Sequence, residues 1–129
     1  MRRLLVDTGP LVAWFDADDT HHEAVKRYLD SYDGELLSTW PVLTETCHLL
    51  PESIVPGFMQ WVATGGLTIA DLPMDLADAS LIRLAENLGV LDVLTLDRRD
   101  FGIYRTARGK ALRNVLDTAH AVRRRPGSR

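Results

Sequence analysis

Four carboxylates stand out in the sequence because each lies within or just after an apolar stretch. They are Asp7 after Leu4-Leu5-Val6, Glu45 in Val42–Leu50, Asp78 in Leu76–Leu81 and Asp97 after Leu94-Thr95-Leu96. A buried carboxylate is costly unless it is paired or binds a metal, and converging carboxylates repel one another unless a cation lies between them. Oxygen ligands suit Mg²⁺ or Mn²⁺, and such an ion can activate a water for attack at phosphorus.

Each of these acids also fits a structural role. Asp7 could cap a helix and Glu45 could lie on the exposed side of one. Asp78 could belong to a capping box, and Asp97 could form an Asx turn. A fifth acid, Asp100, fits a turn before Phe101-Gly102. We favour a common site for the four because all of them fall where one cleft could collect them.

The elements that must position these acids alternate between strands and helices. Apolar runs predict strands at 4–6, 36–38, 67–69 and 92–96, and an edge strand at 103–105. Helical spacing predicts helices at 11–15, 21–32, 39–50, 53–64 and 76–88, and glycines close the last two. This alternation indicates an α/β fold with a mainly parallel central sheet of four to five strands, covered on both faces. Ligands in such folds bind beyond the carboxyl ends of the strands, where Asp7 and Asp97 are expected.

Composition limits the protein to a single domain of ordinary size. The chain has 129 residues and one cysteine, which excludes an internal disulfide and a zinc site built from cysteine pairs. We expect a cytoplasmic protein, because no apolar run approaches the roughly 20 residues that span a bilayer and a secretory signal is not evident. The expected organisation is a domain over 1–117 and a flexible tail over 118–129.

The net charge of −3 hides an uneven distribution along the chain. Residues 1–104 carry seventeen acidic and seven basic residues, whereas residues 105–129 carry one acidic and eight basic residues. The two parts therefore have net charges of −10 and +7. A basic end on an acidic body suits nucleic acid or an acidic partner, and it equally suits a solubilising tail.

The acidic residues and their flanks resemble the PIN-domain family, and within it the VapC-type toxins of bacterial and archaeal toxin–antitoxin pairs. The matching stretches cover about residues 4–105 and are Leu5–Ala13, Leu43–Glu45, Asp75–Leu81 and Leu94–Phe101. No single stretch is specific, but the four in this order are. The resemblance implies a compact α/β/α sandwich and an Mg²⁺- or Mn²⁺-dependent endoribonuclease that hydrolyses RNA phosphodiesters with a metal-activated water.

The resemblance also implies a role for each acid. Asp7, Glu45, Asp78 and Asp97 match the catalytic acids, and all of these except Glu45 match metal ligands. Thr8 and Thr95 match the hydroxyl residues that accompany the first and fourth acids. Asp100 matches an additional acid of this branch.

Partners follow from the same resemblance. An RNA substrate, a small VapB-like antitoxin that inserts into the acidic cleft, and a homodimer are implied. Basic residues next to Asp97 are expected to guide the RNA backbone, which would make RNA binding salt-dependent; they are Arg98, Arg99, Arg105, Arg108 and Lys110.

Two other functions remain open from the residues alone. A PIN-like protein could act mainly as a partner-binding module, although loss of an acid would be expected then. Another Mg²⁺-dependent phosphodiesterase or phosphatase is disfavoured, because Gly9 stands where haloacid-dehalogenase-like enzymes carry a second aspartate. The histidines lack metal-ligand spacing, Cys47 is expected to be an inert thiol, and the aromatic residues are expected in the core or at a subunit contact.

Overall fold

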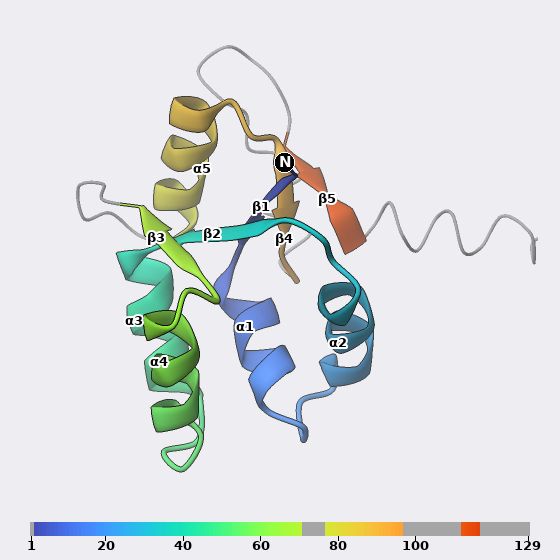
Figure 1. The fold of residues 1–129 in the computed structure, drawn as a ribbon, viewed down its shortest axis with the longest axis vertical. Helices are drawn as coiled ribbons and strands as arrows, with labels where there is room; N and C mark the ends of the chain where they lie inside the picture. The colour runs from blue at the N-terminus through green and yellow to red at the C-terminus, as the bar shows by residue number, and fades with distance from the viewer. Residues whose placement is uncertain (1, 71–76, 97–111, 117–129) are drawn as a thin grey trace, which may run out of the picture.

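A five-stranded, fully parallel sheet forms the centre of the molecule (Figure 1). The structure, a computed structural model, describes residues 2–70, 77–96 and 112–116, and the side chains of 77–80 are outside that description. The strands lie in the order β3-β2-β1-β4-β5. Their bounds are β1 Arg3–Val6, β2 Glu35–Thr39, β3 Thr68–Ala70, β4 Asp92–Leu94 and β5 Arg113–Asn114.

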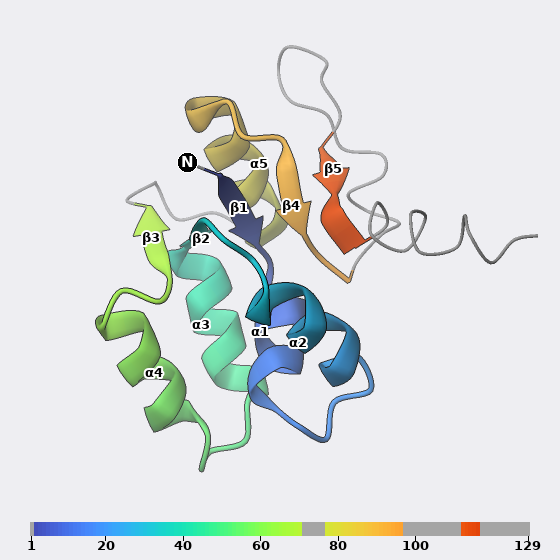
Figure 2. The same ribbon diagram turned by 45° about the vertical axis from the view of Figure 1, so that its right-hand side comes forward.

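Five helices are defined within the described residues, and they connect or precede these strands. They are α1 Thr8–Phe15, α2 His22–Asp30, α3 Trp40–Leu49, α4 Val55–Ala63 and α5 Ala77–Leu88. Helices α1 and α2 lead from β1 to β2, α3 and α4 lead from β2 to β3, and α5 precedes β4 (Figures 1 and 2). In the described part of the chain, no helix has the length and apolar character needed to cross a membrane.

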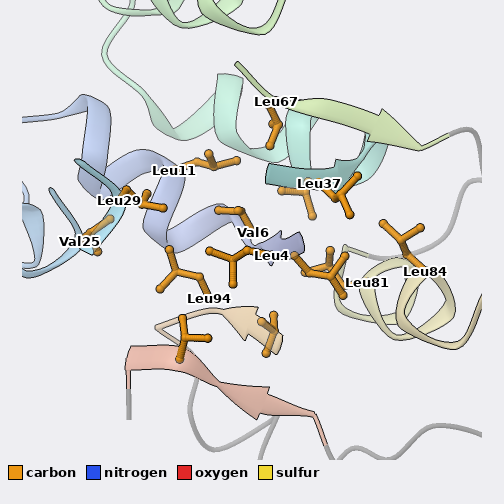
Figure 3. Close-up of a cluster of buried hydrophobic side chains, with 14 of the residues drawn as sticks. Leu4, Val6, Leu11, Val25, Leu29, Leu37, Leu67, Leu81, Leu84 and Leu94 are labelled. Carbon is orange, nitrogen blue, oxygen red and sulfur yellow. The ribbon is translucent and has the colours of Figure 1, made fainter. Parts of the chain in front are cut away.

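The helices cover both faces of the sheet. Figure 3 shows Leu11 and Val25 from α1 and α2 on one side of the central strands, and Leu81 and Leu84 from α5 on the other. The direction of the crossovers reverses between β1 and β4, since β1 leads outward to β2 and β3 whereas the chain returns to β4 on the opposite side. Such a reversal is the point at which α/β sheets bind ligands.

Strand β1 is buried on both faces, which explains its continuous apolar sequence. Leu4, Leu5 and Val6 have no exposed surface. Full burial of a side chain of this size stabilises the folded state by about 1.5–3 kcal/mol. These three residues therefore fix the position of the end of β1. The residue that follows them, Asp7, therefore has a well-defined position at the carboxyl edge.

The predicted α/β class and parallel sheet are confirmed, and the elements lie close to their predicted positions. Gly65 and Gly89 end α4 and α5 with φ values of 97° and 68°, the left-handed conformation expected of glycine after a helix. Thr39 occupies the cap position of α3 without a side-chain hydrogen bond to the helix. The fifth described strand, β5, was not predicted, while the predicted strand at 103–105 and the tail at 118–129 lie outside the described residues.

Candidate active site at the carboxyl ends of β1 and β4

Asp7 lies at the reversal point of the sheet, between the ends of β1 and β4. Its backbone N–H donates to the carbonyl oxygen of Leu94 at 3.0 Å, which continues the β1–β4 pairing. Its side chain caps α1, because Oδ1 accepts a hydrogen bond from the Thr8 backbone N–H at 2.8 Å. The helix-cap role that the sequence suggests for Asp7 is therefore confirmed, and its catalytic role stays a prediction.

The other oxygen of this carboxylate is held by Thr95, the residue that follows β4. Thr95 Oγ1 donates to Asp7 Oδ2 at 2.7 Å, within the range of a charge-assisted hydrogen bond. Both residues are buried, Asp7 at 6% and Thr95 at 0% exposure. Two hydrogen bonds from different elements therefore fix the carboxylate plane, and the positive end of the α1 dipole favours its charge.

The backbone before Asp7 is anchored by a third element. The hydroxyl of Ser38, fully buried in β2, donates to the carbonyl oxygen of Val6 at 2.8 Å. The peptide bond that leads into Asp7 is thus held from β2 on one side and from β4 on the other. Sequence reasoning did not single out Ser38, although a serine that ends the apolar run Leu36-Leu37 is a recognisable signal.

Glu45 on α3 is brought to the same place by Thr8. Thr8 Oγ1 donates to Glu45 Oε1 at 2.6 Å, so Thr8 contacts Asp7 through its backbone and Glu45 through its side chain. Glu45 as a residue is exposed, whereas Asp7 is buried. One buried and one exposed carboxylate are therefore linked through Thr8.

The donor set fits a hard divalent cation as far as the structure describes it. Asp7 and Glu45 offer oxygen ligands only, which Mg²⁺ and Mn²⁺ prefer, and hydroxyl and amide donors restrict both carboxylates. Among the described side chains, no group of three or more His, Cys, Asp or Glu residues is placed to hold a metal ion.

For Asp78, another of the predicted acids, the structure describes only the backbone. It lies in the first turn of α5, at the end that faces α3 and the carboxyl end of β1 in both views (Figures 1 and 2). Its side chain and the remaining predicted residues lie outside the description; these are Asp97, Asp100, Arg98, Arg99, Arg105, Arg108 and Lys110.

Asn114 at the end of β5 joins this region and was missed by sequence reasoning. Its side-chain amide donates to the carbonyl oxygen of Thr95 at 3.0 Å, and its Oδ1 accepts from the backbone N–H of Leu116 at 3.2 Å. An asparagine just before the apolar pair Val115-Leu116 is a helix-cap signal, and that signal could have marked it.

Other residues with reactive side chains lie apart from the site or are inert. Cys47 packs against Met59, with 3.6 Å between the sulfurs, and burial raises the pKa of its thiol. A protonated thiol is a poor nucleophile at neutral pH. Phe15 and Phe58 lie in or against the core as expected, whereas Trp40 is 46% exposed on α3.

Comparison with known proteins agrees with this fold. The crystal structure of Mycobacterium tuberculosis VapC20, described as a sarcin–ricin loop cleaving toxin, superimposes with a TM-score of 0.65 over 74% of this chain and 91% of that one. At 17% identity, this match shows a common fold. The ribonuclease VapC26 of the same organism is 27% identical over 128 residues, covering 82% of this chain and 95% of that protein.

The resemblance to VapC-type PIN-domain proteins is confirmed. No family model matches the chain, so the assignment depends on these relatives and on the geometry. The VapC-type likeness extends over nearly the whole length of both relatives.

Proposed function

We propose that the protein is a metal-dependent endoribonuclease and the toxin of a VapBC-type toxin–antitoxin pair. One observation carries the proposal: the buried Asp7 carboxylate is held between Thr8 and Thr95 at the reversal point of the sheet. A carboxylate that only caps α1 does not require the second, charge-assisted hydrogen bond, which Thr95 donates from just beyond the end of β4. The similarity to a ribonuclease named VapC26 supports RNA as the substrate.

The proposed ligands of the ion are Asp7, Asp78 and Asp97, with Glu45 as a further catalytic acid. When bound, Mg²⁺ or Mn²⁺ supplies activation of a water nucleophile and stabilisation of charge on the phosphate. Thr8 and Thr95 orient the carboxylates: the Thr8 backbone N–H and Thr95 Oγ1 donate to the two oxygens of Asp7, and Thr8 Oγ1 donates to Glu45 Oε1. Because Asp7 is buried and Glu45 exposed, we assign the ion to the side of Asp7 and the substrate to the side of Glu45.

Substrate binding is assigned to the basic residues that follow Asp97. Arg98, Arg99, Arg105, Arg108 and Lys110 are proposed to contact RNA phosphates, with Asp100 as an additional acid of the site. An acidic body repels RNA, so this cationic segment provides the attraction that binding requires. A VapB-like antitoxin, a homodimer and a cytoplasmic location complete the proposal.

Metal removal provides the test of this function. We expect purified protein to cut total cellular RNA into discrete fragments with Mg²⁺ or Mn²⁺, and EDTA to stop the cleavage. A hairpin of the sarcin–ricin loop belongs in the substrate panel, because the solved toxin with this fold is named for cleaving it. Restoring excess Mn²⁺ after EDTA should restore the same fragments.

Two results would contradict the proposal. Folded, antitoxin-free protein that cuts no RNA with either ion would favour the partner-binding module. Cleavage that persists in EDTA would exclude the metal-dependent chemistry assigned to these carboxylates.

Thr8→Val tests whether the Thr8 hydroxyl positions Glu45. Valine has nearly the same volume and lacks the O–H that donates to Glu45 Oε1, so Glu45 loses its fixed orientation. We expect the cleavage rate to fall roughly 10- to 100-fold, as for other residues that orient metal-site carboxylates. Thr46→Val is the matched control, since Thr46 is also buried but donates to Val42 within α3. Equal losses in both variants would contradict the positioning role.

A further inference from the structure

We infer that Asn114 is a positioning residue of the active site, acting on Asp7 through Thr95. This inference rests on the proposed nuclease function and adds a residue that neither the acid pattern nor the resemblance includes. Asn114 ends β5, at the edge of the sheet. Its side chain is one hydrogen bond away from the residue that holds the Asp7 carboxylate.

The path from Asn114 to Asp7 runs through a single residue. Asn114 Nδ2 donates to the Thr95 carbonyl at 3.0 Å, and Thr95 Oγ1 donates to Asp7 Oδ2 at 2.7 Å. A bond to the carbonyl limits rotation of the peptide group that follows Thr95. Because Thr95 is fully buried and threonine has restricted χ1 rotamers, fixing its backbone also fixes the direction of its hydroxyl.

The chemistry of asparagine suits this position. The amide nitrogen donates to Thr95 while the amide oxygen accepts from the Leu116 backbone N–H at 3.2 Å. Aspartate can accept from Leu116 but cannot donate to a carbonyl oxygen. The Asn114 side chain therefore combines two roles: its oxygen is a local cap for Leu116, and its nitrogen forms a long-range hydrogen bond to Thr95.

The rest of β5 shows why this bond matters. The strand has two residues, and its other member, Arg113, is exposed and forms a bidentate ion pair with Asp92 at 2.7 and 2.9 Å. Arg113 thus fastens β5 to the start of β4, while Asn114 fastens it beyond the end of β4. Only the second attachment contacts Thr95, so the two residues provide a matched pair for an experiment.

The test compares Asn114→Asp and Asn114→Ser with Arg113→Gln in the full-length protein. Asn114→Asp keeps an oxygen that can cap Leu116 and removes the donor to Thr95, and Asn114→Ser keeps a capping oxygen but replaces the amide donor with a hydroxyl on a side chain one atom shorter. Arg113→Gln, in contrast, weakens β5 away from the site. Mn²⁺ alone is titrated into each protein and free Mn²⁺ is followed by electron paramagnetic resonance. Steady-state RNA cleavage is measured well below each melting temperature.

We expect the Mn²⁺ dissociation constant to rise about three- to tenfold in both Asn114 variants. This is less than the 10- to 100-fold loss of metal affinity that is typical when a residue bonded directly to a metal-ligating side chain is replaced. The kcat should fall by a similar factor, with KM for RNA changed by less than about twofold, because the phosphate contacts are intact. Arg113→Gln should lower the melting temperature while leaving Mn²⁺ affinity and kcat at the wild-type values.

Three outcomes would overturn the inference. Wild-type Mn²⁺ affinity and kcat in both Asn114 variants would show that the bond to Thr95 does not position the site. An equal loss in Arg113→Gln would show that β5 acts only through its stability. Wild-type protein that neither binds Mn²⁺ nor cleaves RNA would overturn the proposed function itself, and the inference with it.

Discussion

Asp7→Asn is expected to lower RNA cleavage at least about a thousandfold, equivalent to about 4 kcal/mol in the activation barrier. The substitution removes the charge of the carboxylate that lies between the ends of β1 and β4 while keeping its shape. A neutral amide is a weak ligand for a hard divalent ion, so both metal affinity and catalysis should be lost. Single-turnover cleavage of a labelled RNA with saturating Mn²⁺ measures the effect.

The fold should survive this substitution. Asparagine caps helices about as well as aspartate, and its Oδ1 can still accept from the Thr8 N–H. The melting temperature should therefore stay within about 2 °C of the wild-type value. Asp16→Asn is the control, because Asp16 ends α1 and likewise accepts from a backbone N–H, that of Asp18 at 3.0 Å, away from the site. Full activity in Asp7→Asn would exclude this site.

Phe58→Ala is expected to have the largest effect on stability, about 3–5 kcal/mol in the free energy of unfolding. Phe58 on α4 is fully buried. Its ring packs edge-on against Phe15 with 5.1 Å between the ring centroids, which joins α4 to the end of α1. Its centroid lies 6.0 Å from that of Trp61 on the same helix. Its removal leaves a cavity and breaks both aromatic contacts. Thermal unfolding should shift downward by roughly 10–20 °C.

The neighbouring Met59 provides the control for this prediction. Met59 follows Phe58 on the same helix and is 39% exposed, so Met59→Ala should change the free energy of unfolding by less than about 1 kcal/mol. Activity per folded molecule should be preserved in Phe58→Ala at low temperature, because the ring cluster lies at the opposite end of α1 from Asp7. If Phe58→Ala lowered the free energy of unfolding as little as Met59→Ala does, the prediction would be contradicted, and the cavity would have to collapse around the missing ring.

The strands that could be predicted are those stabilised by apolar burial. In a parallel sheet the inner strands are covered on both faces and appear as continuous apolar runs, as in Leu4-Leu5-Val6 before Asp7. Strand β5 could not be predicted this way, because Arg113 and Asn114 are polar. Side-chain bonds to Asp92 and Thr95 hold this strand, and such bonds leave no periodic pattern.

The candidate site was predictable in composition but not in its connections. Asp7 and Glu45 are recognisable from their apolar flanks, and the resemblance identifies Thr8 and Thr95 as the hydroxyl residues that accompany the first and fourth acids, Asp7 and Asp97. Which hydroxyl holds which carboxylate depends on the pairing of Val6 with Leu94 and on where α3 packs against α1. These are long-range contacts that local patterns do not encode, and they explain why Asn114 was overlooked.

The bond between Thr95 and Asp7 joins residues that are 88 positions apart, which has a consequence for synthesis of the protein. A ribosome adds about 5–20 residues per second, so roughly 4–18 s separate the emergence of Asp7 from that of Thr95. During this interval the nascent chain has the first carboxylate but lacks the strand that orients it. We therefore expect the proposed nuclease site to stay incomplete until Thr95 has been synthesised and has paired with Asp7.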